Sequence, residues 1–441
     1  MTMSIELISF LMILTFLILL VSGLPLAWTM GATAVFWCLI LYSPAILVML
    51  CSRIFRLMLN YVMVSIPLFV FMGTILQQSG VADDLFDAVY VWSGPFRGGL
   101  AIGTILACTV MAAMVGIVGA EIVTLGMIAL PNMLKRGYDH RIALGSICAG
   151  GGMATLIPPS VVFIVYAMVA EASVGELFIG GVLPGLLLAV LFLGYIIIAC
   201  WIKPEWAPAA PAEELNVPLA KKVAMLKGLI MPGILGASVL GSIYTGVATP
   251  SEAAGIGCVG ALVSAAINRR LNWKGLKMAV YETAKVTAML AWLMFGAQCI
   301  IGIFSLAGGD EFVRNWVMAL PGGKWGVIIG MQLIMIFLGM FLDWVGIVFL
   351  CMPLFVPIIE TMGFSKVWFG VVFCMNMHIS YLSPPFGPSI FYMKGVVGDE
   401  ISVTRIYQAN LPYLWLTFLA LALTMAFPQL SLWLPSLMLH H

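Results

Sequence analysis

The sequence predicts an all-α polytopic membrane protein made of two inverted repeats. Of its 441 residues, 63% are hydrophobic and 9% are charged, whereas a soluble globular domain has about 47% and about 25%. Apolar stretches of about 20 residues, enough to cross a bilayer, recur from Ser4 to the C-terminal end. Glycine and proline landmarks recur in one order in the two halves, which indicates a duplicated architecture.

Hydropathy and helix-breaking residues divide the chain into a series of expected helices. A polar, proline-rich linker at 203–222 separates a first repeat, 1–202, from a second repeat, 223–441. In chain order the expected helices cover 4–22, 26–50, 55–79, 98–135 (interrupted), 140–170 (interrupted), 174–202, 223–246, 250–268, 284–306, 324–361 (interrupted), 366–396 (interrupted) and 405–434.

The landmarks of the two halves are separated by a nearly constant distance along the chain. Gly98-Gly99 recurs in the second half as Gly322-Gly323, and Pro158-Pro159 recurs with almost the same separation as Pro384-Pro385. Further pairs are Pro25 with Pro250, Gly31 with Gly257, Gly73 with Gly296, Gly137 with Gly363 and Pro184 with Pro412. We interpret this order as an internal repeat.

Each repeat is expected to contain one re-entrant hairpin, at 98–135 and at 324–361. A hairpin enters and leaves on one face, so each repeat makes five crossings, and this odd number gives the repeats opposite orientations. On this threading fifteen Lys and Arg residues lie on one side of the membrane and five on the other. Because cytoplasmic loops collect basic residues, we expect the larger set and the linker in the cytoplasm and both termini outside.

Two interrupted helices carry the strongest signal for a binding site. Gly150–Ser160 and Asn376–Ser389 each contain glycines or polar residues and then a Pro-Pro pair. Irregular backbone at membrane depth occurs where it lines a cavity or is buried in protein. A simple proline kink is the alternative, but duplication in both halves favours a site where freed carbonyls bind cations and half-helix N-termini bind an anion.

Intramembrane carboxylates are a second signal, because a charge at a helix centre costs about 2.5–3.5 kcal/mol or more. Glu121 and Asp343 lie in the middle of the two hairpins, at near-equivalent positions of the two repeats. Each could bind a ligand or instead cap the second arm of its hairpin. The two roles are compatible.

Other motifs have structural interpretations. Thr249-Pro250-Ser251-Glu252 is a typical capping box with proline at the first helical position. His378, inside the second break, could relay protons, although a single buried histidine is more often packed and hydrogen-bonded. The nine cysteines lack metal or disulfide spacing, and a net charge of +1 gives no indication of nucleic-acid binding.

Several short motifs occur in an order that is specific to one family. The chain resembles the large membrane subunit of a tripartite ATP-independent periplasmic (TRAP) transporter, of the dicarboxylate-permease large-subunit type. The motifs that carry this resemblance are Gly137–Asp139, Ile157–Ser160, Leu177–Gly185, Gly246–Ala254 and Ser383–Gly387.

The resemblance implies a sodium-coupled, elevator-type importer in the bacterial inner membrane, with periplasmic termini. It would receive a small organic acid, a carboxylate or sulfonate, from a periplasmic substrate-binding protein and work with a small membrane subunit. Sodium is the implied coupling ion, and no organic cofactor is implied. The implied parts are scaffold helices 1–80 and 223–306, arms 81–97 and 307–322, hairpins 98–135 and 324–361, broken helices 140–170 and 366–396, and helices 174–202 and 405–434.

Site residues follow by match to the family pattern. Substrate contacts would come from Gly119, Glu121, Ser160, Ser383 and Ser389. Sodium contacts would come from Gly116, Ala120, Gly152, Thr155, Pro158, Asp343, Gly346, Ser380 and Pro384. The family commonly has small hydroxyl residues at the first hairpin tip, whereas this chain has glycine and alanine, so backbone carbonyls are favoured there.

Two other functions are alternatives to import. A stand-alone exporter or antiporter of the same architecture, coupled to sodium or protons, would transport without a binding protein. An intramembrane enzyme would need a convergent acid, base or nucleophile set, and the spans contain no His pair, HExxH motif or nucleophile elbow. We therefore expect no enzymatic activity.

Overall fold

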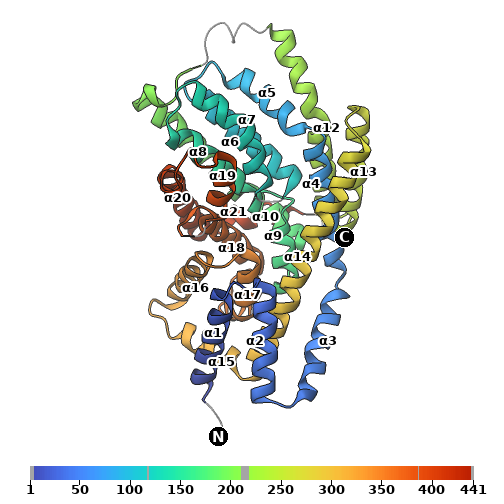
Figure 1. Cartoon of the computed structure of the whole chain (residues 1–441), viewed down its shortest axis with the longest axis vertical. Helices are drawn as coiled ribbons and strands as arrows, with labels where there is room; N and C mark the ends of the chain where they lie inside the picture. Colours follow the sequence, from blue (N-terminus) through green and yellow to red (C-terminus); the bar gives the residue numbers. More distant parts are fainter. Residues whose placement is uncertain (1–3, 117–118, 210–217, 386, 439–441) are drawn as a thin grey trace.

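The computed structural model describes residues 4–116, 119–209, 218–385 and 387–438, and every regular element in these ranges is a helix. Six helices there are long and apolar enough to cross a membrane, or seven if the bent pair α15–α16 counts as one span. The predicted all-α polytopic membrane protein is therefore confirmed at this level. The molecule is elongated, with α1, α2, α3 and α15 at one end and α5 and the start of α12 at the other (Figure 1).

The first half contains a run of helices that ends in a long span. In order they are α1 (Ile5–Val21), α2 (Leu26–Leu41), α3 (Leu47–Met58), α4 (Ser65–Gln78), α5 (Val81–Ser93), α6 (Gly99–Val115), α7 (Ala120–Lys135), α8 (His140–Gly152), α9 (Val161–Ala170) and α10 (Val174–Ile202). Short 3-10 turns lie at Pro44–Ile46, Tyr61–Val64, Met153–Thr155 and Pro204–Trp206.

The second half passes through a matching order of elements. They are α12 (Leu219–Tyr244), α13 (Pro250–Ile267), α14 (Trp273–Leu306), α15 (Gly309–Met318), α16 (Gly323–Gly339), α17 (Trp344–Thr361), α18 (Lys366–Leu382), α19 (Pro388–Val397) and α20 (Val403–Ala426). The short α21 (Gln429–Leu432) and a 3-10 turn at Pro435–Leu437 follow. One long helix, α14, thus takes the position that α3 and α4 share in the first half.

Three predicted boundaries were wrong. The helices expected at 26–50 and 55–79 are divided differently, because Pro44 starts a 3-10 turn and the side chain of Asn60 accepts a hydrogen bond from the Val62 amide. The helix expected at 284–306 begins at Trp273, where Asn272 caps it by accepting from the Gly275 amide at 2.7 Å. Its first turns are polar, so an apolar pattern detects only the later part.

The arms and the linker also contain structure that the sequence did not indicate. The arms at 81–97 and 307–322 contain α5 and α15. The linker begins with a docked segment, in which Ala207 accepts from the Gly98 amide at 3.0 Å and Trp206 accepts from the Asp139 amide at 2.7 Å. Residues 210–217 of the linker lie outside the described residues, and α12 starts before its end, at Leu219.

Helix ends follow local chemistry. The predicted capping box at the start of α13 is confirmed: Thr249 Oγ1 accepts from the Glu252 amide, and Glu252 Oε2 accepts from the Thr249 amide at 2.8 Å. Asp139 and Ser365 cap α8 and α18 in the same way, by accepting from amides of the first turn. These caps satisfy donors that the helix itself leaves free.

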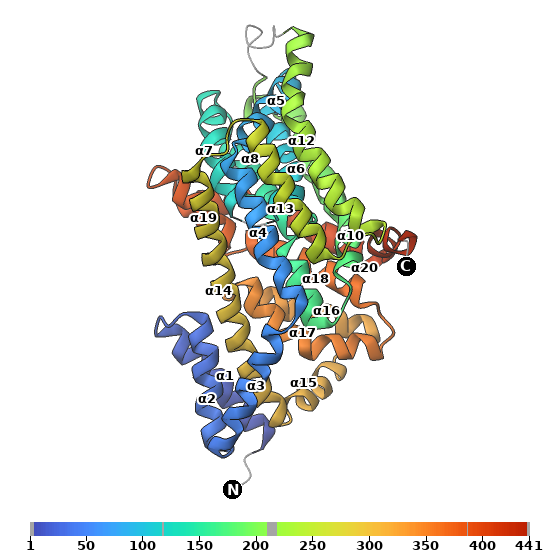
Figure 2. The same ribbon diagram turned by 90° about the vertical axis from the view of Figure 1, so that its right-hand side faces the viewer.

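Two layers of packing place the broken helices at the centre. Along the length of the molecule α2 packs on α14 and α4 packs on α13 (Figure 2). Deeper in the fold the hairpin arms α6 and α7 pack on α8, while α16 and α17 pack on α18. Every residue from Ile142 to Gly152 and from Val367 to Leu382 is buried. The polar groups of these helices are therefore enclosed by protein.

Candidate transport site

Both predicted breaks are present. After α8, a short 3-10 turn at Met153–Thr155 is followed by non-helical residues up to Ser160, and α9 starts at Val161. After α18, Ser383 is extended and α19 starts at Pro388. Phe386 lies outside the described residues. The peptide bonds Pro158-Pro159 and Pro384-Pro385 are both cis.

Hydroxyl groups at the first break donate hydrogen bonds to backbone carbonyl oxygens. Thr155 Oγ1 donates to the Gly152 carbonyl at 3.0 Å, and Ser160 Oγ donates to the Thr155 carbonyl at 2.9 Å. All three residues are buried. A hydroxyl that has given its proton to a carbonyl still has lone pairs for a further contact, so these oxygens can coordinate a cation.

At the second break, side-chain hydroxyls also donate hydrogen bonds to backbone carbonyls. Ser380 Oγ donates to the Asn376 carbonyl at 3.2 Å, and Ser383 Oγ donates to the Ser380 carbonyl at 3.3 Å. The Tyr407 hydroxyl donates to the carbonyl of Pro385. Ser389, one residue into α19, is buried, and its hydroxyl has no partner in the described ranges. This N-terminal turn of α19 therefore holds a free hydroxyl beside the first amides of a helix.

The first hairpin tip lies directly on the first break. Gly116 and Gly119 have φ values of +62° and +97°, which L side chains rarely adopt. A Cβ on Gly116 would lie 2.1 Å from the Pro159 carbonyl oxygen, and one on Gly119 would lie 2.6 Å from the ring of Tyr392. Glycine at both positions therefore permits backbone contact with the break and with α19.

The second hairpin tip carries Asp343 at the N-cap of α17. Its carboxylate lies beside the backbone amides of Trp344 and Val345, the first residues of α17, so its position is compatible with both the capping role and the ligand role. The carboxylate lies within electrostatic range of the Tyr381 and Tyr392 hydroxyls. Tyr392 is 41% exposed, so the described residues cover only part of its side chain. A Cβ on Gly119 at the first tip would touch the Tyr392 ring, and the Tyr392 hydroxyl interacts electrostatically with Asp343 at the second tip.

Glu121 is in a different environment. It is fully buried in the first turn of α7, and neither carboxylate oxygen has a partner among the described residues. Cys108 on α6 is within its electrostatic range. The next residue, Ile122, packs on α8, where a Cβ on Gly151 would lie 2.4 Å from Ile122 Cγ1. Glu121 is therefore enclosed where the hairpin meets α8.

The remaining predicted residues divide into two groups. Pro158 and Pro384 are parts of the two breaks, and Ala120 begins α7. Gly152 ends α8 and faces His378, whose ring nitrogens have no partner among the described residues. Gly346, in the first turn of α17, faces α2, where a Cβ on it would lie 3.1 Å from Leu26 Cδ2.

Sequence reasoning did not single out two features near the second break. Asn376 and Gln332 are joined by hydrogen bonds between α18 and α16, and Tyr392 connects the two tips. Buried amides inside apolar helices are a usable sequence signal, because unpaired polar groups are costly in lipid. Tyr392 could not be singled out from the sequence, because aromatic residues are common in membrane helices.

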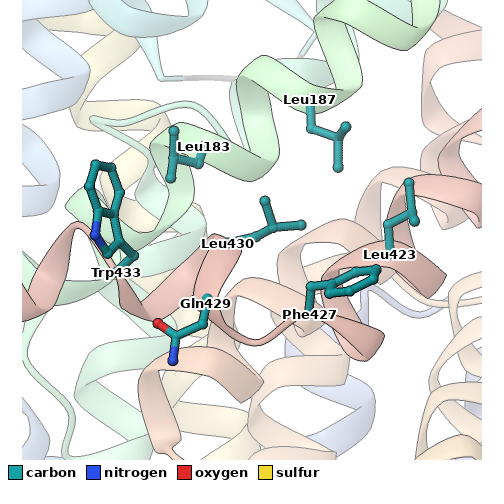
Figure 3. A pocket seen from close by; sticks show the side chains of 7 residues that line it. All are labelled: Leu183, Leu187, Leu423, Phe427, Gln429, Leu430 and Trp433. Atoms are coloured by element: carbon teal, nitrogen blue, oxygen red, sulfur yellow. The ribbon is translucent and has the colours of Figure 1, made fainter.

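One pocket among the described residues is lined almost entirely by apolar side chains and by none of the predicted site residues. It has a volume of about 520 Å³ and lies between α10 and the bend from α20 to α21 (Figure 3). Its lining is Leu183, Leu187, Leu423, Phe427, Gln429, Leu430 and Trp433. This lining contains one side-chain amide, that of Gln429, and no charged group. It therefore offers no cationic side chain to bind an organic acid.

The two breaks present oxygen atoms to the buried interior. In the described ranges no group of three His, Cys, Asp or Glu side chains could hold a metal ion. The available ligands are carbonyl and hydroxyl oxygens with Asp343 nearby. Such oxygen ligands at unwound helices are the kind that coordinate sodium in secondary transporters.

A polytopic helical fold with two broken helices, each packed against a pair of helices that precedes it, is typical of membrane transporters. The family model described as "Tripartite ATP-independent periplasmic transporter, DctM component" matches residues 13–430, so this chain belongs to that family. The predicted resemblance is confirmed. Because the relatives are transporter permeases, the chain is a solute-transport subunit and not an enzyme.

Individual relatives cover most of the chain. The C4-dicarboxylate TRAP transporter large permease protein DctM of Pseudomonas aeruginosa is 32% identical over 90% of this chain and 92% of its own length. The ectoine TRAP transporter large permease protein TeaC of Halomonas elongata is 29% identical over 85% and 86%. The sialic acid TRAP transporter large permease protein SiaM of Vibrio cholerae is 28% identical over 86% and 87%.

Solved structures share the fold. The YdaH transporter of Alcanivorax borkumensis superposes with a TM-score of 0.63 at 15% identity, covering 87% of each chain. MtrF of Neisseria gonorrhoeae superposes with a TM-score of 0.60 at 12% identity, covering 87% of this chain and 83% of its own. At these identities the likeness concerns the architecture alone.

Proposed function

We propose that this chain is the large membrane subunit of a sodium-coupled importer of a small organic acid anion. A periplasmic substrate-binding protein delivers the anion, and a small membrane subunit completes the transporter in the inner membrane, with both termini of this chain periplasmic. The observation that carries the proposal is that the first hairpin tip contacts both the first break and α19, while Gly339, at the end of α16, contacts Ser380 before the second break. Hydroxyls and freed carbonyls gather in this buried interior.

Sodium binding is supported by the acceptor character of this interior. The hydroxyls of Thr155 and Ser380 already donate to carbonyls, which leaves their lone pairs for a cation. Carbonyls of Gly116, Ala120, Gly152, Pro158 and Pro384 would add neutral ligands, and Asp343 would add a charge. Gly346 remains a weaker candidate because it faces α2.

Anion binding is assigned to the half-helix ends. The N-termini of α9 and α19 follow the two breaks, and the free ends of helices favour negative charge. Ser389 places a hydroxyl without a partner among the described residues at the start of α19. The Ser160 and Ser383 hydroxyls donate to carbonyls here and would turn to donate to the anion, with the Gly119 backbone beside α19. Relatives are named for C4-dicarboxylate, isethionate, ectoine and sialic acid, so we assign an organic acid and no single compound.

Inverted repeats are supported by the exchange of helix partners. The matching element orders relate α2 to α13 and α14 to α3–α4, and the packed pairs are α2 with α14 and α4 with α13. The related arms α5 and α15 lie at opposite ends of the molecule (Figure 1). A rotation that exchanges the halves accounts for both observations, whereas a simple translation does not.

An elevator mechanism follows from this division. Helices α1–α4 and α12–α14 would form the scaffold, and the hairpins, broken helices, α10 and α20 would form the moving transport domain. The arms α5 and α15 would connect the two parts. Loading of sodium and substrate would close the polar interior before the domain slides, because an unpaired polar cavity is costly to move through lipid.

The partner subunits are supported by family membership and by one longer relative. This chain matches 65% of the isethionate TRAP transporter permease protein DctMQ of Oleidesulfovibrio alaskensis. The additional length of that protein is where a fused small subunit would lie.

Reconstituted uptake tests the proposal. Proteoliposomes would contain this chain and its small subunit, and a loaded binding protein would be added outside. Uptake should require an inward sodium gradient and fall at least about tenfold in Asp343→Ala, since a charge-assisted contact contributes about 1.5–3 kcal/mol. The mechanism would be contradicted if uptake did not depend on the sodium gradient and if Asp343→Ala transported at the wild-type rate. Transport without the binding protein would instead favour the stand-alone exporter or antiporter.

A further inference from the structure

A buried pair of side-chain amides joins the first arm of the second hairpin to the broken helix α18. Asn376 Nδ2 donates to the Gln332 carbonyl at 3.0 Å and to Gln332 Oε1 at 2.8 Å. Both residues are buried, while Asn376 Oδ1 and Gln332 Nε2 have no partner among the described residues. Half-satisfied amides in a core cost stability. Apolar side chains would hold these helices together at lower cost, so the pair indicates a role other than stability.

The first half uses different chemistry at the same contact. Cys108 precedes Gln332 by the separation that relates Gly98 to Gly322, and Gly150 precedes Asn376 by the separation that relates the two Pro-Pro pairs. A Cβ on Gly150 would lie 2.7 Å from Cys108 Sγ, so α6 and α8 meet there by close packing. Close packing tolerates small rotations of one helix on another, whereas two directional hydrogen bonds fix one register.

The amide pair belongs to a seam that leads to the second break. Along α16, Gly339 follows Gln332 by about two helical turns, and along α18, Ser380 follows Asn376 by about one turn. A Cβ on Gly339 would lie 2.0 Å from Ser380 Oγ, which itself donates to the Asn376 carbonyl at 3.2 Å. The register set by the amides is therefore transmitted directly to Ser380.

The same seam sets the place of the second tip. Asp343 follows shortly after Gly339, where α16 ends, and its carboxylate lies within electrostatic range of Tyr381, the neighbour of Ser380. A shift of α16 along α18 would change the separation of Asp343 and Ser380. Oxygen ligands of a small cation tolerate little such change, because the ion must touch them simultaneously.

We propose that Gln332 and Asn376 are positioning residues that hold Asp343 and Ser380 at the separation required for sodium binding. This inference rests on the proposed function, because it assumes that the second break binds sodium. The pair does not touch the ion. Its loss lowers sodium affinity through the register of the hairpin.

Sodium-dependent stabilisation of the full chain in detergent tests the inference without a substrate. The thermal unfolding midpoint is measured while sodium chloride replaces potassium chloride at constant ionic strength, and its rise gives the sodium dissociation constant. Asn376→Leu removes both hydrogen bonds, and Gln332→Met removes one while keeping similar volume. We expect the dissociation constant to rise about fivefold to tenfold in Asn376→Leu and less in Gln332→Met, since one hydrogen bond contributes about 0.5–1.5 kcal/mol. The double variant should match Asn376→Leu.

Cys108→Ala is the matched control, because it changes the related contact in the first half. Its sodium dissociation constant should stay within about twofold of the wild type, because Cys108 meets Gly150 by close packing and no directional hydrogen bond between these two residues is lost. An equal rise in this control would overturn the inference, as would folded variants with an unchanged dissociation constant and a lower midpoint in potassium alone. If Asn376→Leu does not fold, Gln332→Met decides the question. A wild-type chain that sodium does not stabilise would contradict the proposed function itself.

Discussion

The ring of His378 packs against Gly152, its counterpart in the first half of the chain. The separation of these two residues along the chain is the same as that between the two Pro-Pro pairs, so they occupy related positions in α18 and α8. Related residues touch each other where a twofold axis passes between them. The contact therefore supports a twofold relationship between the broken helices. At this point the small residue Gly152 makes room for the large ring of His378.

Gly152→Ala is expected to destabilise the protein. The new Cβ would lie 2.7 Å from His378 Cε1 and 2.9 Å from its Nδ1, and the buried ring has little room to move. Overpacking of this kind costs about 1–3 kcal/mol. Thermal unfolding of the purified chain measures the loss. Gly194→Ala in α10 is the control, because nothing lies within 4 Å of a Cβ there, and its midpoint should be unchanged or higher.

Gly116→Ala should abolish transport, whereas Gly137→Ala should not. Both glycines have positive φ, +62° and +74°, so both substitutions introduce backbone strain of about 1–2 kcal/mol. Only at Gly116 would the Cβ also collide with a backbone atom, the Pro159 carbonyl oxygen at 2.1 Å, while Gly137 has open space. Uptake in proteoliposomes compares the two variants. Equal activities would show that the first tip does not need its contact with the break.

Tyr392 offers a test of the connection between the hairpin tips. Tyr392→Phe keeps the ring that covers Gly119 and removes only the hydroxyl near Asp343, so uptake should stay within about threefold of the wild type. Tyr392→Ala removes the ring and should lower uptake about tenfold, which corresponds to about 1.4 kcal/mol. The opposite order, with the phenylalanine variant as impaired as the alanine variant, would assign the contribution to the hydroxyl.

Arg270 should stabilise the junction between α4 and the first arm. Its guanidinium donates to both carboxylate oxygens of Asp84, at 2.8 and 2.9 Å, and to the carbonyls of Ser79 and Gly80. The two side chains are 41% and 35% exposed, so solvent screening limits the pair to about 1 kcal/mol. A double-mutant cycle of Arg270→Met and Asp84→Asn on thermal stability should give a coupling of this size. A coupling of zero would show that the carbonyl contacts alone hold the arginine.

Much of the fold was readable from local chemistry. The Pro-Pro pairs interrupt their helices because proline removes donors, and Thr249 and Glu252 form a capping box because their spacing allows reciprocal bonds. The extension of α14 to Trp273 and the division of α3 from α4 were missed, because hydropathy detects the membrane-embedded part of a helix and not its polar turns.

The site was only partly predictable for a related reason. Asp343 and the hydroxyls of the breaks are visible as polar residues in apolar surroundings, and their role as ligands stays a prediction. Gly346 fits the same local pattern, yet it faces α2, because its direction depends on how α17 packs and not on its neighbours in the chain.

The sequence by itself determined that this chain is a helical membrane protein, that its two halves share one order of landmarks, and that it belongs to one transporter family. Composition and spacing are properties of the chain alone, so they can be read without a fold. Only the tertiary structure decided that His378 meets Gly152, that Tyr392 touches the first tip, and that Gln332 bonds to Asn376. Each of these contacts joins residues from different helices, and the packing of those helices results from the sum of many weak contacts along their lengths.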